Sequence, residues 1–374
     1  MHIDTTVKKP ESPSAAGPAP EKAPTAPRRR RSKSVTANDV AQEAGVSVGT
    51  VSRVVNHAPT VTHEVRERVM AAVKKLGWAP DVSAQGMRGV PARMVGFVFS
   101  DIRNPLYSHM VKGAEDALSE KGYMLVVAST DGRPEREVAL IQLLTRRRAD
   151  GMLLTVQEET NAALLQTVQL AKVPFVMVER ELALPIDSVG ADHLNGTYQA
   201  TAYLLSLRHQ RIALISGGRN NRVARDRLAG YTKAHTEAGV AVDPSLVRMD
   251  SFATEYGFRE TQILLGMPQR PTAIISSGQR LLSGVLEAIR MKGCEIPRDV
   301  SLIASNDTEL ARLITPAITA VRYDPYAMGR EAALQLLRRI NHEIPEGAIR
   351  IEVPTEFILR DSCAAPCVKE GSRA

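Results

Sequence analysis

The sequence predicts an α/β protein in which a small all-α unit precedes two doubly wound lobes of parallel sheet. From residue 94 onward, short apolar runs alternate with longer amphipathic segments almost to the end of the chain. This alternation is typical of βα units wound into parallel sheets. Residues 94–374 exceed the usual size of a domain with one sheet, which favours two lobes with a cleft between them. Before them, three short helical patterns follow one another from residue 36.

Hydrophobic periodicity places the elements of the α/β part. We expect strands at residues 94–99, 124–128, 152–155, 175–178, 212–216, 273–275 and 302–304. Amphipathic helices are expected between them, with examples at residues 106–120, 135–147, 196–207, 225–237, 279–291 and 326–339.

The positive charge of the chain is confined to its first quarter. Residues 1–93 contain 15 Lys and Arg against 8 Asp and Glu, whereas residues 94–374 contain 33 of each. A basic module on a neutral body suggests that one end binds a polyanion. A solvated basic tail would produce the same balance.

Composition divides the chain into five segments. We expect a disordered basic tail, a helical headpiece, a short polar linker, a large core and a C-terminal tail, at residues 1–34, 35–80, 81–93, 94–361 and 362–374. The C-terminal tail has no apolar heptads, so a tetramer built on a terminal helical bundle is not expected.

Several classes of protein are disfavoured by composition. The chain has no run of eighteen apolar residues and no apolar signal segment at its N-terminus, so we expect a cytoplasmic protein with no membrane partner. Cys294, Cys363 and Cys367 are too few for a disulfide framework, and the eight His show no metal-binding spacing. We therefore expect no metal and no cofactor.

Residues 36–56 have the pattern of a helix-turn-helix. Thr36 can cap a first helix with Asp39 in an approximate capping box, and Gly45 can supply the turn. Ser47 can cap the second helix, and Thr62 can open a third. The second helix would then turn Val51, Val54 and Val55 inward and leave Val48, Gly49, Ser52 and Arg53 outward for a partner. Any small helical bundle with Gly in a turn would share these features.

The outward face of the second helix suits the edges of DNA bases. Arg53 can contact a guanine edge with two hydrogen bonds, and Val48 can pack on a thymine methyl. Ser47, Thr50 and Asn56 are suited to phosphates. With the neighbouring positions, the candidate DNA-contacting residues are Thr36, Ser47, Val48, Gly49, Thr50, Ser52, Arg53, Asn56 and Met87.

The string from Val40 to Asn56, with Ala-Gly-Val-Ser followed by Thr-Val-Ser-Arg-Val-Val-Asn, resembles the headpiece of the lac-repressor family of transcriptional regulators. The resemblance continues through Leu-Gly-Trp-Ala-Pro, Asp-Ile-Arg-Asn-Pro-Leu-Tyr and Arg-Leu-Ala-Gly-Tyr, and covers roughly residues 36–360. It implies a dimer, a palindromic double-stranded DNA operator and repression of transcription. It also implies a core like that of periplasmic sugar-binding proteins, with an effector between two lobes.

The resemblance also implies that the linker folds into a hinge helix on DNA and inserts an apolar side chain into the minor groove. Met87 occupies that position, and an inserted Met can kink a base step. Gly86 weakens the helix by about 1 kcal/mol relative to Ala, so we expect the hinge to be disordered without DNA. The alternative is that Met87 is an ordinary exposed linker residue. The basic run at residues 28–33 either follows the DNA backbone or is a solvated tail.

Ligands of parallel sheets collect beyond the carboxyl ends of the strands. That position and the resemblance together nominate as effector-binding residues Asp101, Tyr107, Thr155, Glu179, Asp192, Arg227, Phe252, Gly278 and Asn306. The resemblance assigns Arg227 as the effector-binding arginine and Phe252 as the stacking aromatic. Without it, Arg227 would be read as a surface residue, Phe252 as core and Asn306 as a turn cap.

These residue types suit a polyhydroxylated or carboxylated ligand, a sugar or sugar acid. The chain departs from the family pattern at Ser277-Gly278-Gln279 and at Ser305-Asn306-Asp307, so the effector of a relative cannot be transferred. The loss of an acid and an amide there, with Arg103, Arg180 and Arg222 in nearby segments, hints at an anion.

An enzyme is the main competing class. The chain has no Walker loop, no His-Glu-x-x-His and no Gly-x-Ser-x-Gly, and Gly217-Gly218 is too short for a dinucleotide fingerprint. A transport binding protein would share the core but would need export. The attached headpiece favours a regulator over both classes.

Overall fold

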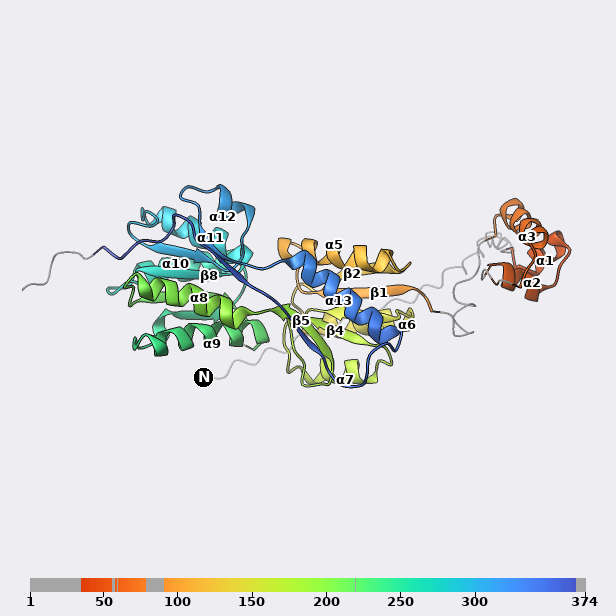
Figure 1. The fold of residues 1–374 in the computed structure, drawn as a ribbon, viewed down its shortest axis with the longest axis horizontal. Coiled ribbons are helices and arrows are strands. Elements are labelled where there is room, and N and C mark those ends of the chain that lie inside the picture. Colours follow the sequence, from red (N-terminus) through yellow and green to blue (C-terminus); the bar gives the residue numbers. More distant parts are fainter. Residues whose placement is uncertain (1–34, 56–57, 59, 79–90, 219, 368–374) are drawn as a thin grey trace, which may run out of the picture. The chain divides into compact units, whose positions relative to one another are not determined.

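The computed structural model describes residues 35–367, except residues 56–57, 59, 79–90 and 219. The chain divides into two units, residues 1–81 and 82–374. Figure 1 shows the helices of the first unit in red and orange and the two sheets of the second unit from orange to blue.

The first unit is built from α1 (Ala37–Ala44), α2 (Val48–Val55) and α3 (His63–Leu76). Thr36 and Asp39 form the expected capping box at the start of α1, where the Asp39 N–H donates to Thr36 Oγ1 at 3.4 Å. Gly45 ends α1 with a φ of 62°, a left-handed conformation that glycine adopts without strain. Val51, Val54 and Val69 are buried between the helices, so the helix-turn-helix predicted from the sequence is present.

The first sheet of the second unit has the strand order β11-β5-β4-β3-β1-β2 and is parallel throughout. Its strands are β1 (Met94–Phe99), β2 (Met124–Ser129), β3 (Gly151–Leu154), β4 (Phe175–Val178), β5 (Asp187–Ala191) and β11 (Arg350–Val353). One face packs against α5 (Pro105–Ser119) and α13 (Pro325–Ile340), and the other against α6 (Pro134–Arg146) and α7 (Ala162–Leu170). We call this layered structure lobe 1.

The second sheet has the order β12-β10-β9-β8-β6-β7, and only β12 runs antiparallel to its neighbour within the described residues. Its strands are β6 (Ile212–Gly217), β7 (Val247–Asp250), β8 (Ala273–Ser277), β9 (Ser301–Ala304), β10 (Thr319–Arg322) and β12 (Glu356–Ile358). The covering helices are α8 (His193–Ser206), α9 (Arg222–Glu237), α10 (Thr254–Leu265) and α11 (Gln279–Met291), with α12 (Glu309–Leu313) at one edge. This is lobe 2.

The chain crosses between the lobes after β5, after β10 and after β11. Asp192 lies at the first crossing, where its side chain accepts a hydrogen bond from the Asn195 N–H and caps α8. Thr355 lies at the third crossing, and its hydroxyl donates to the Asp192 carbonyl at 3.4 Å. The first and third crossings are therefore joined by a hydrogen bond.

The predicted strands are all present, and the fold class is confirmed. The strands that the sequence analysis did not place are β5, β7, β10, β11 and β12. They are short, and β5 and β11 contain Asp, Gly, Arg or Glu within four or five residues. Their pairing joins segments far apart in the chain, for example β11 with β5 and β12 with β10. Local hydrophobic periodicity carries little information about such strands.

Two glycines allow α5 and α13 to pack closely. A Cβ atom at Gly113 would collide with the Tyr326 carbonyl, and one at Gly329 would collide with the Met110 carbonyl. Because neither glycine has a side chain, the backbones of α5 and α13 can lie in direct contact.

Ser362, which the sequence analysis assigned to the C-terminal tail, is fully buried against lobe 2. Its hydroxyl donates to the Leu302 carbonyl at 2.6 Å and accepts from the Thr319 N–H at 2.8 Å. The described residues 362–367 therefore begin as part of the packed core.

Candidate functional site

The exposed face of α2 carries most of the residues nominated for DNA contact. Ser47, Val48, Gly49 and Arg53 are exposed, and Thr50 and Ser52 are half-buried. The Ser47 hydroxyl accepts from the Thr50 N–H at 3.1 Å and so caps α2 as expected. Thr36 is also exposed, and its part in the capping box accounts for its conformation.

Arg53 lies back along its own helix. Its Nε donates to the Gly49 carbonyl at 3.3 Å, and its Nη2 donates to Thr50 Oγ1 at 3.4 Å. These contacts hold the guanidinium over the first turn of α2, the part of a recognition helix that meets base edges. Asn56 and Met87, the two remaining nominated residues, lie outside the described residues.

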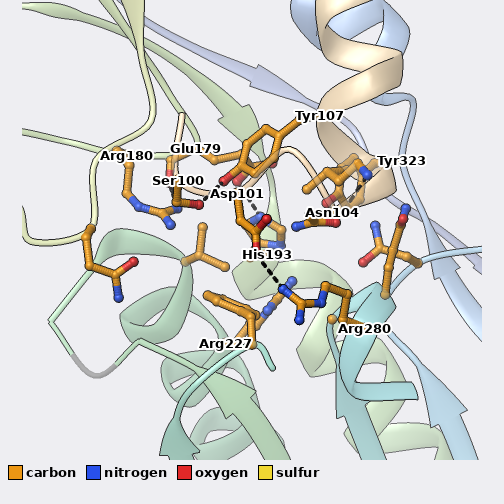
Figure 2. A pocket seen from close by; sticks show the side chains of 17 residues that line it. Ser100, Asp101, Asn104, Tyr107, Glu179, Arg180, His193, Arg227, Arg280 and Tyr323 are labelled. Carbon is orange, nitrogen blue, oxygen red and sulfur yellow. Dashed lines mark hydrogen bonds and ion pairs between the residues drawn. The ribbon is translucent and has the colours of Figure 1, made fainter. Parts of the chain in front are cut away.

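The second unit contains a pocket between lobe 1 and lobe 2, at the carboxyl ends of strands from both sheets (Figure 2). Its cavity volume is about 80 Å³, which is room for a small polar molecule or several waters. Asp101, Tyr107 and Glu179 reach it from lobe 1. Arg227, Phe252, Gly278 and Asn306 reach it from lobe 2, so seven of the nine nominated effector residues line the pocket.

The structure does not bring Thr155 and Asp192 into this pocket. Thr155 is buried beneath it, with its hydroxyl donating to the Val178 carbonyl at 3.0 Å. Asp192 caps α8 at the lobe crossing instead. Both residues follow strands as expected, but strand position alone does not say which way a side chain points.

Arg227 is held in the wall of the pocket by lobe 2. Its side chain is 3% exposed, and its Nη1 donates to the Ser277 carbonyl at 2.7 Å and to Ser216 Oγ at 3.3 Å. The guanidinium carbon lies 5.9 Å from the centroid of the Phe252 ring, a cation–π distance. Burial lowers the pKa of Arg227.

Glu179 and His193 form a buried pair across the pocket floor. Glu179 Oε2 lies 2.6 Å from His193 Nε2. Burial opposes ionisation of Glu179, but the hydrogen bond from His193 and the charges of the neighbouring arginines hold its pKa below the usual range. Burial also lowers the pKa of His193, which favours a neutral ring that donates its Nε2–H to the carboxylate.

Asp101 joins the two lobes at the rim of the pocket. Arg103 donates to it from Nε and Nη2 at 2.9 Å each, and Arg280 of lobe 2 donates from Nη1 at 2.7 Å. The hydrogen bonds from Arg103, followed by the charges of Arg103 and Arg280, hold the pKa of Asp101 below its ordinary value. The carboxylate is therefore ionised and fully engaged at neutral pH.

Tyr107 lies on α5 with its ring stacked on Phe99, with centroids 4.8 Å apart. Its hydroxyl lies 3.0 Å from Ser100 Oγ in the pocket wall. The buried Tyr107 and Tyr323 and the half-buried Phe252 supply aromatic surface. Amides come from Asn104, Gln157 and Asn306.

The sequence analysis did not nominate ten residues of the pocket wall. They are Ser100, Asn104, Leu106, Gln157, Arg180, His193, Val223, Gln279, Arg280 and Tyr323. Several of them adjoin a nominated residue, and a wider window around each strand end would have included them. Tyr323 lies at a lobe crossing, and no pattern in the sequence marks that position.

The described residues contain no group of three or more His, Cys, Asp or Glu side chains that could hold a metal ion. None of the described helices has the length and apolar content needed to cross a membrane.

Comparison with known proteins decides the family. A model of bacterial regulatory proteins of the lacI family matches residues 36–81, and a model of periplasmic binding protein-like domains matches residues 201–363. The HTH-type transcriptional regulator DegA of Bacillus subtilis (strain 168) is 32% identical over 330 residues, which cover 87% of this chain and 97% of DegA. This chain belongs to the lacI family. It is a DNA-binding transcriptional regulator with a ligand-binding domain.

Other members of the lacI family give the same picture. The HTH-type transcriptional repressor PurR of Haemophilus influenzae (strain PittEE) is 30% identical over 87% of this chain and 98% of PurR. A lac repressor dimer solved with its operator and an anti-inducer has a TM-score of 0.77 and 27% identity, over 89% of this chain and all of that one. The transcriptional regulator CelR, solved with cellobiose, has a TM-score of 0.68 and 31% identity, over 88% of this chain and 99% of CelR.

Proposed function

We propose that this regulator binds a palindromic operator as a dimer, acts as a repressor, and responds to a sugar or sugar acid held between lobes 1 and 2. The observation that carries the proposal is the pocket itself, where Tyr107 and Glu179 of one lobe face Arg227 and Phe252 of the other. A ligand that contacts both lobes binds their closed arrangement more tightly than an open one, and so changes the population of the two.

DNA reading is assigned to α2 within the first unit. The exposed side chains of Ser47, Val48 and Arg53 lie on one helix, with Arg53 held over its first turn. We propose that Arg53 contacts a guanine edge, and that residues 81–93 couple the core to the headpiece. The similar lac repressor was solved as a dimer bound to its operator, which supports operator binding by this chain.

A dimer is supported by an apolar surface on lobe 2. Leu313 is 82% exposed and Leu310 is 40% exposed on α12, beside a groove lined by Leu286, Ile296 and Ile314. Apolar surface concentrated in this way is typical of an interface between proteins. A two-fold dimer would also match the symmetry of a palindromic site.

Selection from randomised duplex DNA tests the proposal directly. The purified chain is incubated with random duplexes, and the bound fragments are sequenced with and without a panel of sugars and sugar acids. We expect a palindrome whose enrichment changes with one compound. A chain from which residues 1–89 are removed serves as the control and should select nothing. Failure of the full chain to enrich any sequence would contradict the proposed function.

A further inference from the structure

The pocket contains more positive charge than its own carboxylates neutralise. Arg180 enters it from lobe 1, and Arg227 and Arg280 enter it from lobe 2 (Figure 2). Of the two carboxylates in the wall, Asp101 already accepts hydrogen bonds from Arg280 and from Arg103 outside the wall. Glu179 is hydrogen-bonded to the His193 ring. That ring is neutral, so the Glu179 charge remains and acts on both Arg180 and Arg227, and the three arginines of the wall exceed its two carboxylates by one charge.

Arg180 donates its hydrogen bonds within the described residues to neutral backbone carbonyls. It is 5% exposed, and it donates from Nε to the Val156 carbonyl at 2.7 Å and from Nη1 to the Glu179 carbonyl at 2.8 Å. A guanidinium has five N–H donors, so several remain for another partner. Within the described part of the chain, Arg180 takes part in no ion pair.

The guanidinium of Arg227 also has an N–H donor without an acceptor among the described residues. Its Nη1 bonds to a carbonyl and a hydroxyl, whereas its Nε is buried and has no hydrogen-bond partner among the described residues. Burial is the main cause that lowers the pKa of Arg227, and the nearby charge of Arg180 lowers it further. Tyr323 and Glu179 act in the opposite direction. An unpartnered buried N–H is costly, and the guanidinium has further N–H groups that can donate to an acceptor in the pocket.

We propose that the effector carries a carboxylate bound by Arg180 and Arg227, so that it is a sugar acid and not a neutral sugar. This inference rests on the proposed function, which makes the pocket the effector site. A carboxylate offers two acceptor oxygens in a plane, which match the planar N–H donors of a guanidinium. One carboxylate between Arg180 and Arg227 would also join lobe 1 to lobe 2.

The rest of the pocket wall suits the hydroxylated part of such a molecule. Asn104, Gln157 and Asn306 offer amide donors and acceptors, and the Phe252 ring offers an apolar face.

Calorimetric titration of the full chain with matched pairs tests the inference. The pairs are D-glucuronate with D-glucose, D-galacturonate with D-galactose, and D-gluconate with sorbitol. In at least one pair, we expect the acid to bind about tenfold or more tightly than its neutral partner, because charge-assisted hydrogen bonds are the stronger kind. Its affinity should also fall as salt is raised.

A charge-removing variant identifies the responsible residue. Arg180→Met keeps a long side chain and removes the guanidinium, so it should weaken binding of the preferred acid by about tenfold or more and reduce the preference for acid. Arg147→Met removes the same charge from an exposed position of lobe 1 outside the pocket and should leave the affinity unchanged. If Arg180→Met fails to fold, the acid preference and salt dependence of the unmodified chain still decide the matter.

Neutral sugars that bind as tightly as their acids would overturn the inference, and so would the failure of all three acids to bind. Selection of operator DNA separates this failure from failure of the proposed function. If binding to a selected operator responds to a neutral sugar, the proposed function stands and the proposal of an acidic effector is wrong. If selection yields no operator, the proposed function itself is wrong.

Discussion

At the scale of single residues, most nominated side chains owe their role to what surrounds them. Arg227 lies near the N-terminus of α9, a position that is often solvent-exposed. Lobe 2 nevertheless buries it against Phe252 and Ser277. His193 and Glu179 are ordinary residues in the sequence and become a buried hydrogen-bonded pair. The chemistry of the pocket therefore depends on burial as much as on residue type.

Arg53→Ala should abolish the preference of the chain for its operator and leave weak, salt-sensitive binding to any duplex. Base edges provide the preference, whereas phosphate contacts provide the remainder. Fluorescence anisotropy with operator and scrambled duplexes at two salt concentrations measures both parts. Arg66→Ala, on α3, is a control that removes an equal charge from the headpiece. Full discrimination by Arg53→Ala would show that another residue reads the site.

Glu137 predicts a pH dependence of stability. It is fully buried on α6, its Oε1 accepts from the Gln157 N–H at 2.8 Å, and its Oε2 has no partner among the described residues. Burial raises its pKa to about 7 from an ordinary 4.5. Because the folded state holds the proton more tightly, the stabilisation is complete below the ordinary pKa and is lost as pH rises through 7.

At pH 8, the free energy of unfolding of Glu137→Gln should therefore exceed that of the unmodified chain by up to about 3 kcal/mol. The reason is that Gln keeps the acceptor and carries no charge. The difference should shrink as pH falls to 5. Urea unfolding at several pH values measures it, with Glu135→Gln, exposed on the same helix, as the control. Parallel pH profiles for Glu137→Gln and the unmodified chain would contradict the buried proton.

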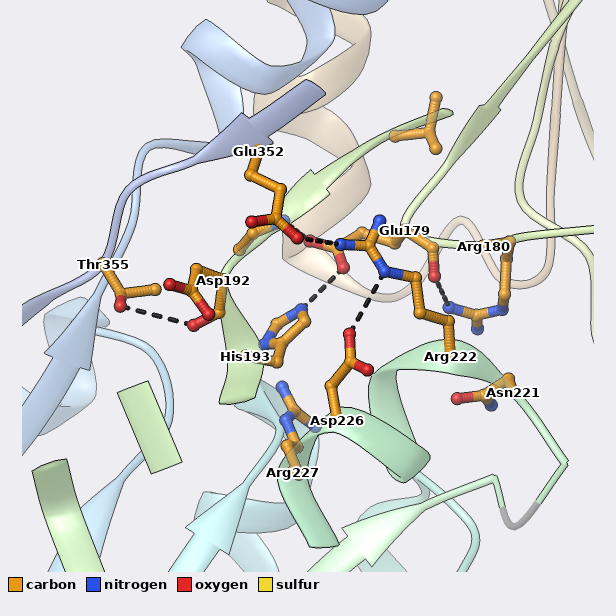
Figure 3. A network of polar contacts seen from close by, with 12 residues as sticks. Glu179, Arg180, Asp192, His193, Asn221, Arg222, Asp226, Arg227, Glu352 and Thr355 are labelled. Atoms are coloured by element: carbon orange, nitrogen blue, oxygen red, sulfur yellow. Dashed lines mark hydrogen bonds and ion pairs between the residues drawn. The ribbon is translucent and has the colours of Figure 1, made fainter. Parts of the chain in front are cut away.

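At the scale of elements, the start of α9 is one place where side chains of lobe 2 bind to lobe 1. The Arg222 side chain is 2% exposed and donates from Nη2 to Glu352 of β11 at 3.0 Å and from Nε to Asp226 at 3.1 Å (Figure 3). Its backbone N–H donates to Glu159 of lobe 1 at 2.8 Å. Val223, the next residue, lines the pocket, so these contacts and the pocket share one helix turn.

Arg222→Met should favour a more open arrangement of the lobes. It removes the ion pairs to Glu352 and Asp226, whose carboxylates are partly exposed and can turn to water. A smaller closed population lowers the apparent affinity for effector by the same factor. Small-angle scattering and effector titration measure the two effects. Lys233→Met, exposed on α9, removes an equal charge and should change neither. Unchanged scattering together with unchanged affinity would show that Arg222 does not hold the lobes.

At the scale of the whole molecule, the proposed mechanism links two separate binding events. An effector that prefers one arrangement of the lobes changes operator affinity, and operator changes effector affinity by the same factor. Couplings of this kind are typically about 1 to 3 kcal/mol, and they can release DNA or promote its binding. Measuring effector affinity with and without operator therefore gives the direction of the response.

Leu313→Glu should convert a dimer into a monomer and weaken operator binding by more than tenfold, roughly the loss of one half-site. The residue is 82% exposed on α12, so the substitution costs little in the isolated chain. Analytical ultracentrifugation measures the state of assembly. Leu170→Glu, where the leucine is 71% exposed at the end of α7, tests whether any exposed leucine has this effect. A dimeric Leu313→Glu would place the interface elsewhere.

The sequence by itself determined the helix-turn-helix, because its capping residues, turn glycine and inward valines act over a few residues. It also determined the parallel α/β character, since strands such as Met94–Phe99 are buried on both faces and read as continuous apolar runs. Seven of the nine nominated effector residues line the pocket because strand ends gather at one edge of a sheet.

Only the tertiary structure decided which side chains face one another across the lobes. It excluded Thr155 and Asp192 from the pocket and added Arg280 and Tyr323, and of the three arginines suspected near the ligand it placed only Arg180 in the wall. It also paired β11 with β5 and β12 with β10, after crossings that local periodicity cannot report. Hydrophobic and capping patterns act between near neighbours, whereas side-chain direction, burial and charge compensation depend on segments that meet only in the folded chain.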